Sequence, residues 1–157
     1  MLETLTNDEI AERLIRDDYR WASNTITVNI SALNYGGQIF ANEAMAMWSD
    51  ATGLNFVTTN SFFADLTFEH GTQSNTAVAG WSYTTSPGDS TSYVTDATIT
   101  ISEDWIEDDW SFAEGADLYS FSFKTFIHEI GHTIGMLHPG DYDGAGRNLR
   151  KQCRICQ

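Results

Sequence analysis

Three histidines and one glutamate lie close together in residues 128–138 and have the chemistry of a metal site. His128 and His132 are four residues apart, and such residues lie on one face of an α-helix about one turn apart, so both imidazoles can bind one metal ion. Glu129 follows His128 directly and leans beside that metal, where a bound water would lie. This pattern is typical of hydrolytic zinc sites. Zinc lowers the pKa of the water and polarises a carbonyl, while the carboxylate takes the proton and passes it to the leaving group.

His138 constrains how the segment folds. It lies six residues after His132, and an unbroken helix would carry it about 9 Å further along the axis and onto another face. We therefore expect the helix to end between the two histidines. Gly135 stands where a C′ residue in the left-handed conformation would end it, and Pro139 blocks a restart. Three imidazoles with an open fourth position are typical of catalytic rather than structural zinc sites.

An ordinary explanation of these histidines is that they are packed or surface residues in a chance H-E-x-x-H match, because short motifs carry false positives. Three of the four histidines in the chain fall within this one stretch. The fourth, His70, lies far from them in the sequence. This concentration favours the zinc-site interpretation.

The segment resembles the metzincin metalloproteases in its H-E-x-x-H-x-x-G-x-x-H pattern. The run from Thr125 to His132, together with His138-Pro139-Gly140-Asp141-Tyr142, is similar to the serralysin branch of that family. The likeness covers about residues 5–144. It implies a secreted, extracellular bacterial endopeptidase that cleaves extended protein or peptide substrates. It also implies that His128, His132 and His138 bind Zn²⁺ and that Glu129 is the general base and then the general acid.

Composition limits the other classes of function. The 157 residues are enough for one domain with a real core, and 41% hydrophobic residues indicate a globular protein. A net charge of −14 argues against nucleic-acid binding. The sequence contains no apolar run of about 18 residues, so it predicts no membrane-spanning helix. We expect a monomer. The first residues lack an apolar signal segment, but serralysins resemble this chain in being exported without an N-terminal signal.

The elements before the motif predict an α+β fold. A capping box, Thr6 to Glu9, opens a helix that runs to about Asp17. Tyr35-Gly36-Gly37 is expected to break the chain before a second helix over 38–51, whose apolar stripe includes Phe40, Ala44, Met47 and Ala51. The zinc helix is expected to begin near Leu118, with Phe123, Ile127, Ile130 and Ile134 on its buried side. Five strands are predicted at 25–30, 55–58, 65–69, 77–83 and 97–101, with residues 84–96 as a loop. We expect a twisted, mixed, mostly parallel sheet that carries the helices, with the zinc helix at its lower edge.

Two segments have a second interpretation. In metzincins the fourth strand is the antiparallel edge that pairs with substrate backbone, and residues 80–83 would take that position here; an ordinary edge strand is the alternative. Residues 103–117 contain seven acidic residues. Such oxygen ligands suit Ca²⁺, although charge runs are usually solvated faces.

The chain departs from the family pattern after His138. No methionine follows Met136, whereas metzincins continue to a methionine-containing turn below the zinc. Residues 145–157 are basic and contain Cys153 and Cys156. We therefore expect residues 1–144 to be a serralysin-like catalytic domain incomplete at its C-terminus, with the lower subdomain largely missing, and 145–157 to be a tail foreign to the family. The alternative to a protease is a non-catalytic, truncated zinc-binding remnant.

Overall fold

The computed structural model describes residues 19–71, 76–88, 90–102, 104, 106, 110–111 and 115–138. The helix predicted at 6–17, most of the acidic segment 103–117 and the tail 145–157 lie wholly or mostly outside these residues. The elements are β1 (Tyr19–Trp21), β2 (Thr25–Asn29), α2 (Tyr35–Thr52), β3 (Asn55–Thr58), β4 (Leu66–Gly71), β5 (Ala77–Thr85), β6 (Ser92–Ser102), β7 (Trp110–Ser111), β8 (Gly115–Ala116) and α4 (Phe121–Thr133). Among the described residues, no helix combines the length and apolar character needed to cross a membrane.

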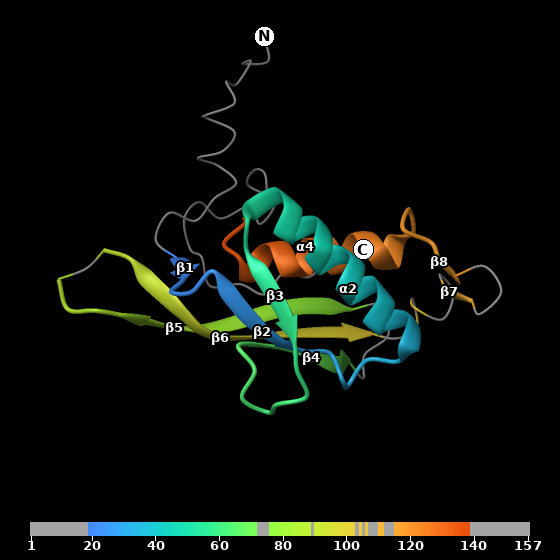
Figure 1. Cartoon of the computed structure of the whole chain (residues 1–157), viewed down its shortest axis with the longest axis horizontal. Coiled ribbons are helices and arrows are strands. Elements are labelled where there is room, and N and C mark those ends of the chain that lie inside the picture. The colour runs from blue at the N-terminus through green and yellow to red at the C-terminus, as the bar shows by residue number, and fades with distance from the viewer. Residues whose placement is uncertain are drawn as a thin grey trace, which may run out of the picture.

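A mixed sheet forms one layer and the helices α2 and α4 form the other (Figure 1). Strands β3, β2, β4 and β6 are parallel neighbours in that order, and β5 pairs antiparallel with the far side of β6. Both helices lie over the same face of the sheet (Figure 1). The predicted α+β fold with a mixed, mostly parallel sheet is therefore confirmed, and so is the antiparallel fourth predicted strand.

All five predicted strands are present, but the sheet has a sixth strand within the described residues. The strand that the sequence did not reveal is β1, which has only three residues and too little alternation to be recognised. It pairs in parallel with the first part of β6, Tyr19 opposite Ser92 and Trp21 opposite Val94. This pairing brings the start of the described chain beside the middle of the sheet.

The loop predicted over 84–96 is also largely wrong. Strand β5 continues to Thr85 and β6 begins at Ser92, so most of this segment is paired. The serine and threonine content suggested a loop, but the hydroxyls of Thr85 and Ser92 form a cross-strand hydrogen bond of 2.7 Å. Threonine, tyrosine and valine are also good strand formers when neighbouring strands are available.

Helix α2 begins three residues earlier than predicted. Asn34 is its N-cap, and the Asn34 side chain accepts a 2.8 Å hydrogen bond from the Gly37 backbone N–H. Gly36 and Gly37 are therefore buried helical residues instead of a break. A Cβ at Gly37 would lie 3.0 Å from the Ile106 side chain, so the glycine allows close packing.

The buried face of α2 differs from the predicted stripe. Phe40 and Ala44 are buried as expected, but Met47 is 53% exposed. The buried face is rotated toward Ala41 and Met45. Tertiary contacts, which periodicity does not reveal, decide this rotation.

The core lies between the sheet and the two helices. Phe40 of α2 packs on Phe123 and Phe126 of α4, with ring centroids 6.0 and 5.9 Å apart. Phe126 also stacks on Phe68 of β4 at 5.7 Å. All four rings are buried, and aromatic contacts of this kind contribute beyond the area they remove from water. The core therefore fixes α4 against both α2 and the sheet.

Candidate metal centre

Helix α4 carries the first three residues of the candidate site. It begins at Phe121 because the Ser120 side chain accepts a hydrogen bond from the Phe123 backbone N–H at 3.1 Å. The predicted start near Leu118 was therefore three residues early. The predicted buried side is confirmed for Phe123 and Ile130, while Ile127 and Ile134 are partly buried against the core.

The helix ends at Thr133, and Gly135 is the C′ residue that the sequence predicted. This residue has φ +99°, the conformation that favours glycine. The Gly135 N–H donates to the His132 carbonyl at 3.2 Å, and the Met136 N–H donates to the Gly131 carbonyl at 2.9 Å. This pair of bonds is the Schellman arrangement. It reverses the chain direction, so that His138 returns toward the helix it has just left.

The reversal brings three imidazoles together. The Nε2 atoms of His128 and His138 are 2.9 Å apart, those of His132 and His128 are 2.9 Å apart, and those of His132 and His138 are 3.1 Å apart. A ring nitrogen carries either a hydrogen or a lone pair, so at least one of three mutual contacts cannot be a hydrogen bond. Tetrahedral zinc, with bonds of 2.0–2.1 Å, separates its ligand atoms by about 3.3 Å. The triangle fits a metal ion better than it fits hydrogen bonding.

A backbone contact fixes the orientation of the His132 ring. Its Nδ1 lies 2.8 Å from the Met136 carbonyl oxygen. A carbonyl only accepts, so Nδ1 is the donor and the neutral ring has its lone pair on Nε2, directed to the cluster. Such a partner behind a ligating histidine holds the tautomer that a metal requires.

The environment also keeps the imidazoles neutral. Burial, helped by the charges that His132 and His138 would carry, lowers the pKa of His128 to about 4. Burial likewise lowers the pKa of His132, and the Met136 carbonyl offsets part of this effect. The two rings are therefore uncharged at neutral pH and available as ligands.

Glu129 is the most unusual side chain of the site. It is 0% exposed, and neither carboxylate oxygen has a hydrogen-bond partner within ordinary geometry. Burial raises the Glu129 pKa to about 7, and the backbone of Ala79 on β5, which does not form a regular hydrogen bond with the carboxylate, acts in the opposite direction. A buried, unpartnered carboxylate is unfavourable unless a cation or a reacting water lies beside it. Glu129 therefore also fits a metal site.

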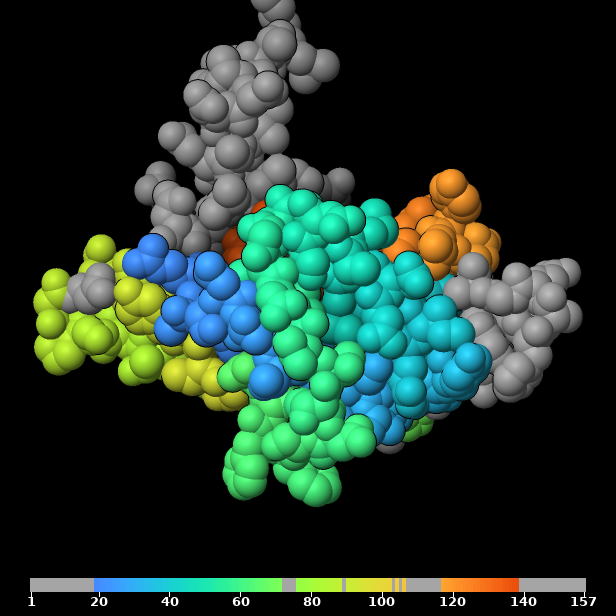
Figure 2. Space-filling view, in the orientation of Figure 1, coloured from blue at the N-terminus to red at the C-terminus, as the bar shows by residue number. Residues whose placement is uncertain are grey.

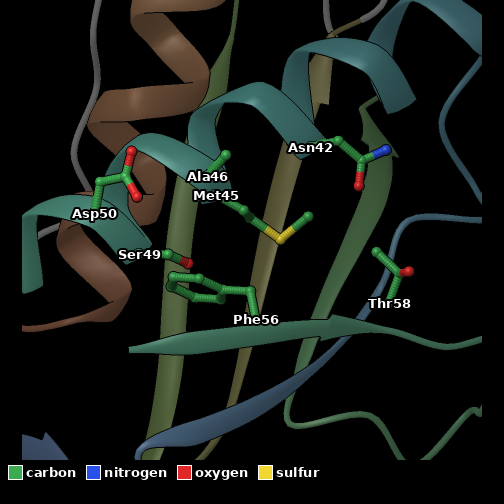
Figure 3. Close-up of a pocket in the computed structure, with 7 residues that line it drawn as sticks. All are labelled: Asn42, Met45, Ala46, Ser49, Asp50, Phe56 and Thr58. Carbon is green, nitrogen blue, oxygen red and sulfur yellow. The ribbon is translucent and has the colours of Figure 1, made fainter. Parts of the chain in front are cut away.

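Two surface pockets lie away from this cluster. One, of about 360 Å³, is lined by α2 and β3 residues that include Met45, Asp50 and Phe56 (Figure 3). The other, of about 540 Å³, lies beside Phe62 and Phe63. Neither pocket is lined by a residue of the histidine cluster. Among the described residues, this cluster is the group of metal-ligating side chains close enough together to hold an ion.

A sequence profile of the matrixins, a family of peptidases, matches residues 19–144. The chain belongs to the matrixin family. Serralysin from Photorhabdus laumondii is 26% identical over an alignment that covers 94% of this chain and 34% of that protein. Serralysin G from Dickeya chrysanthemi is 53% identical over 32 residues, and the metallopeptidase AprA of Pseudomonas marginalis is 32% identical over 69% of this chain. The chain is thus a serralysin-type metzincin in sequence, as the motif predicted.

The alignments with the Photorhabdus serralysins cover most of this matrixin chain. The chain spans only about a third of the length of those relatives. The fold has a solved counterpart in myroilysin, with a TM-score of 0.50 at 19% identity, covering 80% of this chain and 54% of that one. This likeness supports the fold. The histidine cluster in this chain is compatible with the zinc that its family uses.

Two side chains at the site were not identified from the sequence. Trp48 of α2 and Trp21 of β1 each donate an indole hydrogen bond to a backbone carbonyl of α4. Their partners lie 79 and 112 residues away, so no local pattern marks them.

Proposed function

We propose that this matrixin is a zinc-dependent endopeptidase that hydrolyses peptide bonds of extended protein substrates. The observation that carries the proposal is the triangle of Nε2 atoms from His128, His132 and His138, with separations of 2.9–3.1 Å. It lies at the end of α4, the helix that also carries the buried, unpartnered Glu129. Membership of a peptidase family supports the reaction class.

The three histidines would hold the metal, and Glu129 would remain outside the ligand set. A Zn²⁺ ion held there would supply Lewis-acid chemistry, which polarises a carbonyl and lowers the pKa of a water toward 7. The Met136 carbonyl keeps the His132 lone pair on the metal side. The buried flank of α4, formed by Phe123, Phe126 and Ile130, keeps the two helical histidines in one fixed direction.

Glu129 would move the proton. As a carboxylate it removes a proton from the water that attacks the carbonyl carbon, and it then transfers that proton to the peptide nitrogen as the C–N bond breaks. A pKa of about 7 suits both directions, because general acid–base catalysis is most effective near the working pH. The surrounding burial excludes other waters that would solvate the carboxylate.

Strand β5 would bind the substrate backbone. It pairs with β6, and no second described strand pairs with it. The influence of the Ala79 backbone on the Glu129 pKa indicates that the middle of β5 lies beside the site. An extended peptide that adds to β5 by β-augmentation would pass beside the Glu129 carboxylate. Residues 80–83 of this strand remain our predicted contact with substrate.

Other expectations stay predictions. These are secretion, a monomeric state, a calcium site in residues 103–117 and the division of the chain at residue 144. The described residues Asp104 and Asp117 do not belong to a group that could hold an ion.

The metal assignment is tested by zinc titration of the metal-free chain and of two single variants. We expect one Zn²⁺ per chain for the wild type and for His70→Ala, whose exposed histidine on β4 is a control. We expect His138→Ala to lose tight binding, because two imidazoles leave the site incomplete. Equal affinity in all three proteins would refute the site. Tight binding without any cleavage of a peptide substrate would instead support the non-catalytic alternative.

A further inference from the structure

We propose that Trp48 and Trp21 are positioning residues that hold the metal-binding turn of α4, residues 128–132, from its two ends. We call this pair the indole clamp. The proposal rests on the proposed function, because it assigns the clamp to the affinity of the histidine site for zinc.

The first indole fixes the start of the turn. Trp48 Nε1 donates a 2.9 Å hydrogen bond to the carbonyl of Ile127, the residue that directly precedes His128. Within a helix this carbonyl already faces the N–H four residues later, so the indole adds a second donor to it. The bond is partly buried and connects α2 to α4.

The second indole fixes the end of the turn. Trp21 Nε1 donates a 2.9 Å hydrogen bond to the carbonyl of Thr133, the residue that directly follows His132. The last carbonyls of a helix have no partner within it. The reversal at Gly135 supplies donors to Gly131 and His132, and Trp21 supplies one to Thr133. Strand β1 therefore caps the helix at the point where the chain turns back toward His138.

Gly131 shows that Trp48 also packs into the motif itself. A Cβ built on Gly131 would lie 2.9 Å from Cζ2 of the Trp48 ring, closer than real Cβ atoms come to a neighbour. The ring thus lies against the helix at a position between the two helical histidines. Only glycine leaves the room for it.

Together these contacts restrict two movements of α4 at the two metal-binding residues: translation along the helix axis and rotation about it. Each bond acts on the backbone next to a histidine, and neither indole belongs to the ligand set. The core rings also fix this helix, but more generally, because Phe40 of α2 packs on Phe123 and Phe126 of α4. The clamp differs in acting at the two residues that flank the ligands. Groups that orient metal ligands typically contribute 10–100-fold in metal affinity.

The test compares zinc affinity with the stability of the metal-free chain in three variants. Trp48→Phe and Trp21→Phe keep an aromatic ring and remove the indole N–H. Phe40→Leu is the matched control, since it weakens the packing of α2 on α4 without removing a bond to the turn. Affinity is measured by competition with a coloured chelator, and stability by urea unfolding in excess chelator.

We expect each tryptophan variant to bind Zn²⁺ about tenfold more weakly and the double variant about 100-fold more weakly. We expect Phe40→Leu to lower metal-free stability at least as much and to change affinity by less than about threefold. Wild-type affinity in both tryptophan variants would overturn the clamp, and so would a loss in Phe40→Leu equal to theirs. A wild-type chain that binds no Zn²⁺ would instead refute the proposed function, and the clamp with it.

Discussion

Replacing Glu129 by glutamine should stabilise the metal-free chain at alkaline pH while removing its proposed activity. The Glu129 carboxylate is fully buried and has no hydrogen-bond partner, so its charge is unfavourable in the folded state. Glutamine has nearly the same shape and carries no charge. When a side chain is placed for catalysis, its replacement is expected to raise stability while lowering activity.

The magnitude follows from the pKa. Burial raises the Glu129 pKa from 4.5 to about 7 in the folded chain. A raised carboxyl pKa gives a contribution that is fully present below pH 4.5 and is lost as the pH rises through 7. About 2–3 kcal/mol of stability should disappear from the wild type between pH 5 and pH 8 through this group alone. Glu129→Gln lacks this loss, so its stability relative to the wild type should rise by that amount over the same interval.

The assay is urea unfolding of both proteins at pH 5 and pH 8 with excess chelator. The difference between the two pH values removes any constant effect of burying the glutamine amide. The lowered pKa of His128 affects both proteins alike, through stability that is lost as the pH falls from 6.5 through 4. A relative stability of Glu129→Gln that does not change between pH 5 and pH 8 would refute the argument that the carboxylate is buried without a partner.

Three further predictions concern the site and its supports. Because burial lowers the pKa of His128 to about 4, the chain should retain Zn²⁺ well below pH 6.5. The measurement is the zinc content after gel filtration at a series of pH values, and zinc release centred near pH 6.5 would contradict the prediction. Gly131→Ala should displace the Trp48 ring and cost about 1–3 kcal/mol in urea unfolding, and an unchanged midpoint would show that the ring moves freely. Gly135→Ala should cost about 1–2 kcal/mol and weaken zinc binding. Gly88→Ala, also at positive φ but in the turn between β5 and β6, should lower stability alone, and equal zinc affinity in the two variants would separate the Gly135 turn from the site.

The sequence predicted the clustering of the three histidines better than it predicted the surrounding fold. His128 and His132 had to share a helical face, and the position of His138 required a chain reversal that only Gly135 could make cheaply. These constraints are local, covering fewer than a dozen residues, and the structure shows the reversal and the assembled imidazoles. The alternating strands at Ile26–Val28 and Ala97–Ile101 were predictable for the same reason, since alternation reports which side is buried.

The errors arise where distant parts of the chain decide the structure. Two glycines suggested a break before α2, but the Asn34 cap and the close approach of Ile106 make them helical. A serine- and threonine-rich stretch became paired strand because β1 and β5 flank β6 there. The tryptophan bonds to α4 have partners far away in the sequence, so nothing near Trp21 indicates them.

The most direct test of the central claim is hydrolysis of casein by the wild-type chain and by Glu129→Ala, with the zinc content of the same samples measured. We expect about one Zn²⁺ bound per chain in both proteins. We also expect chelator-sensitive cleavage by the wild type and a loss of about 100-fold or more in the variant, the usual contribution of a general base. Equal cleavage by the two proteins at equal zinc content would contradict the role of Glu129. Zinc bound by both with no cleavage by either would show that this chain binds the metal without being a protease.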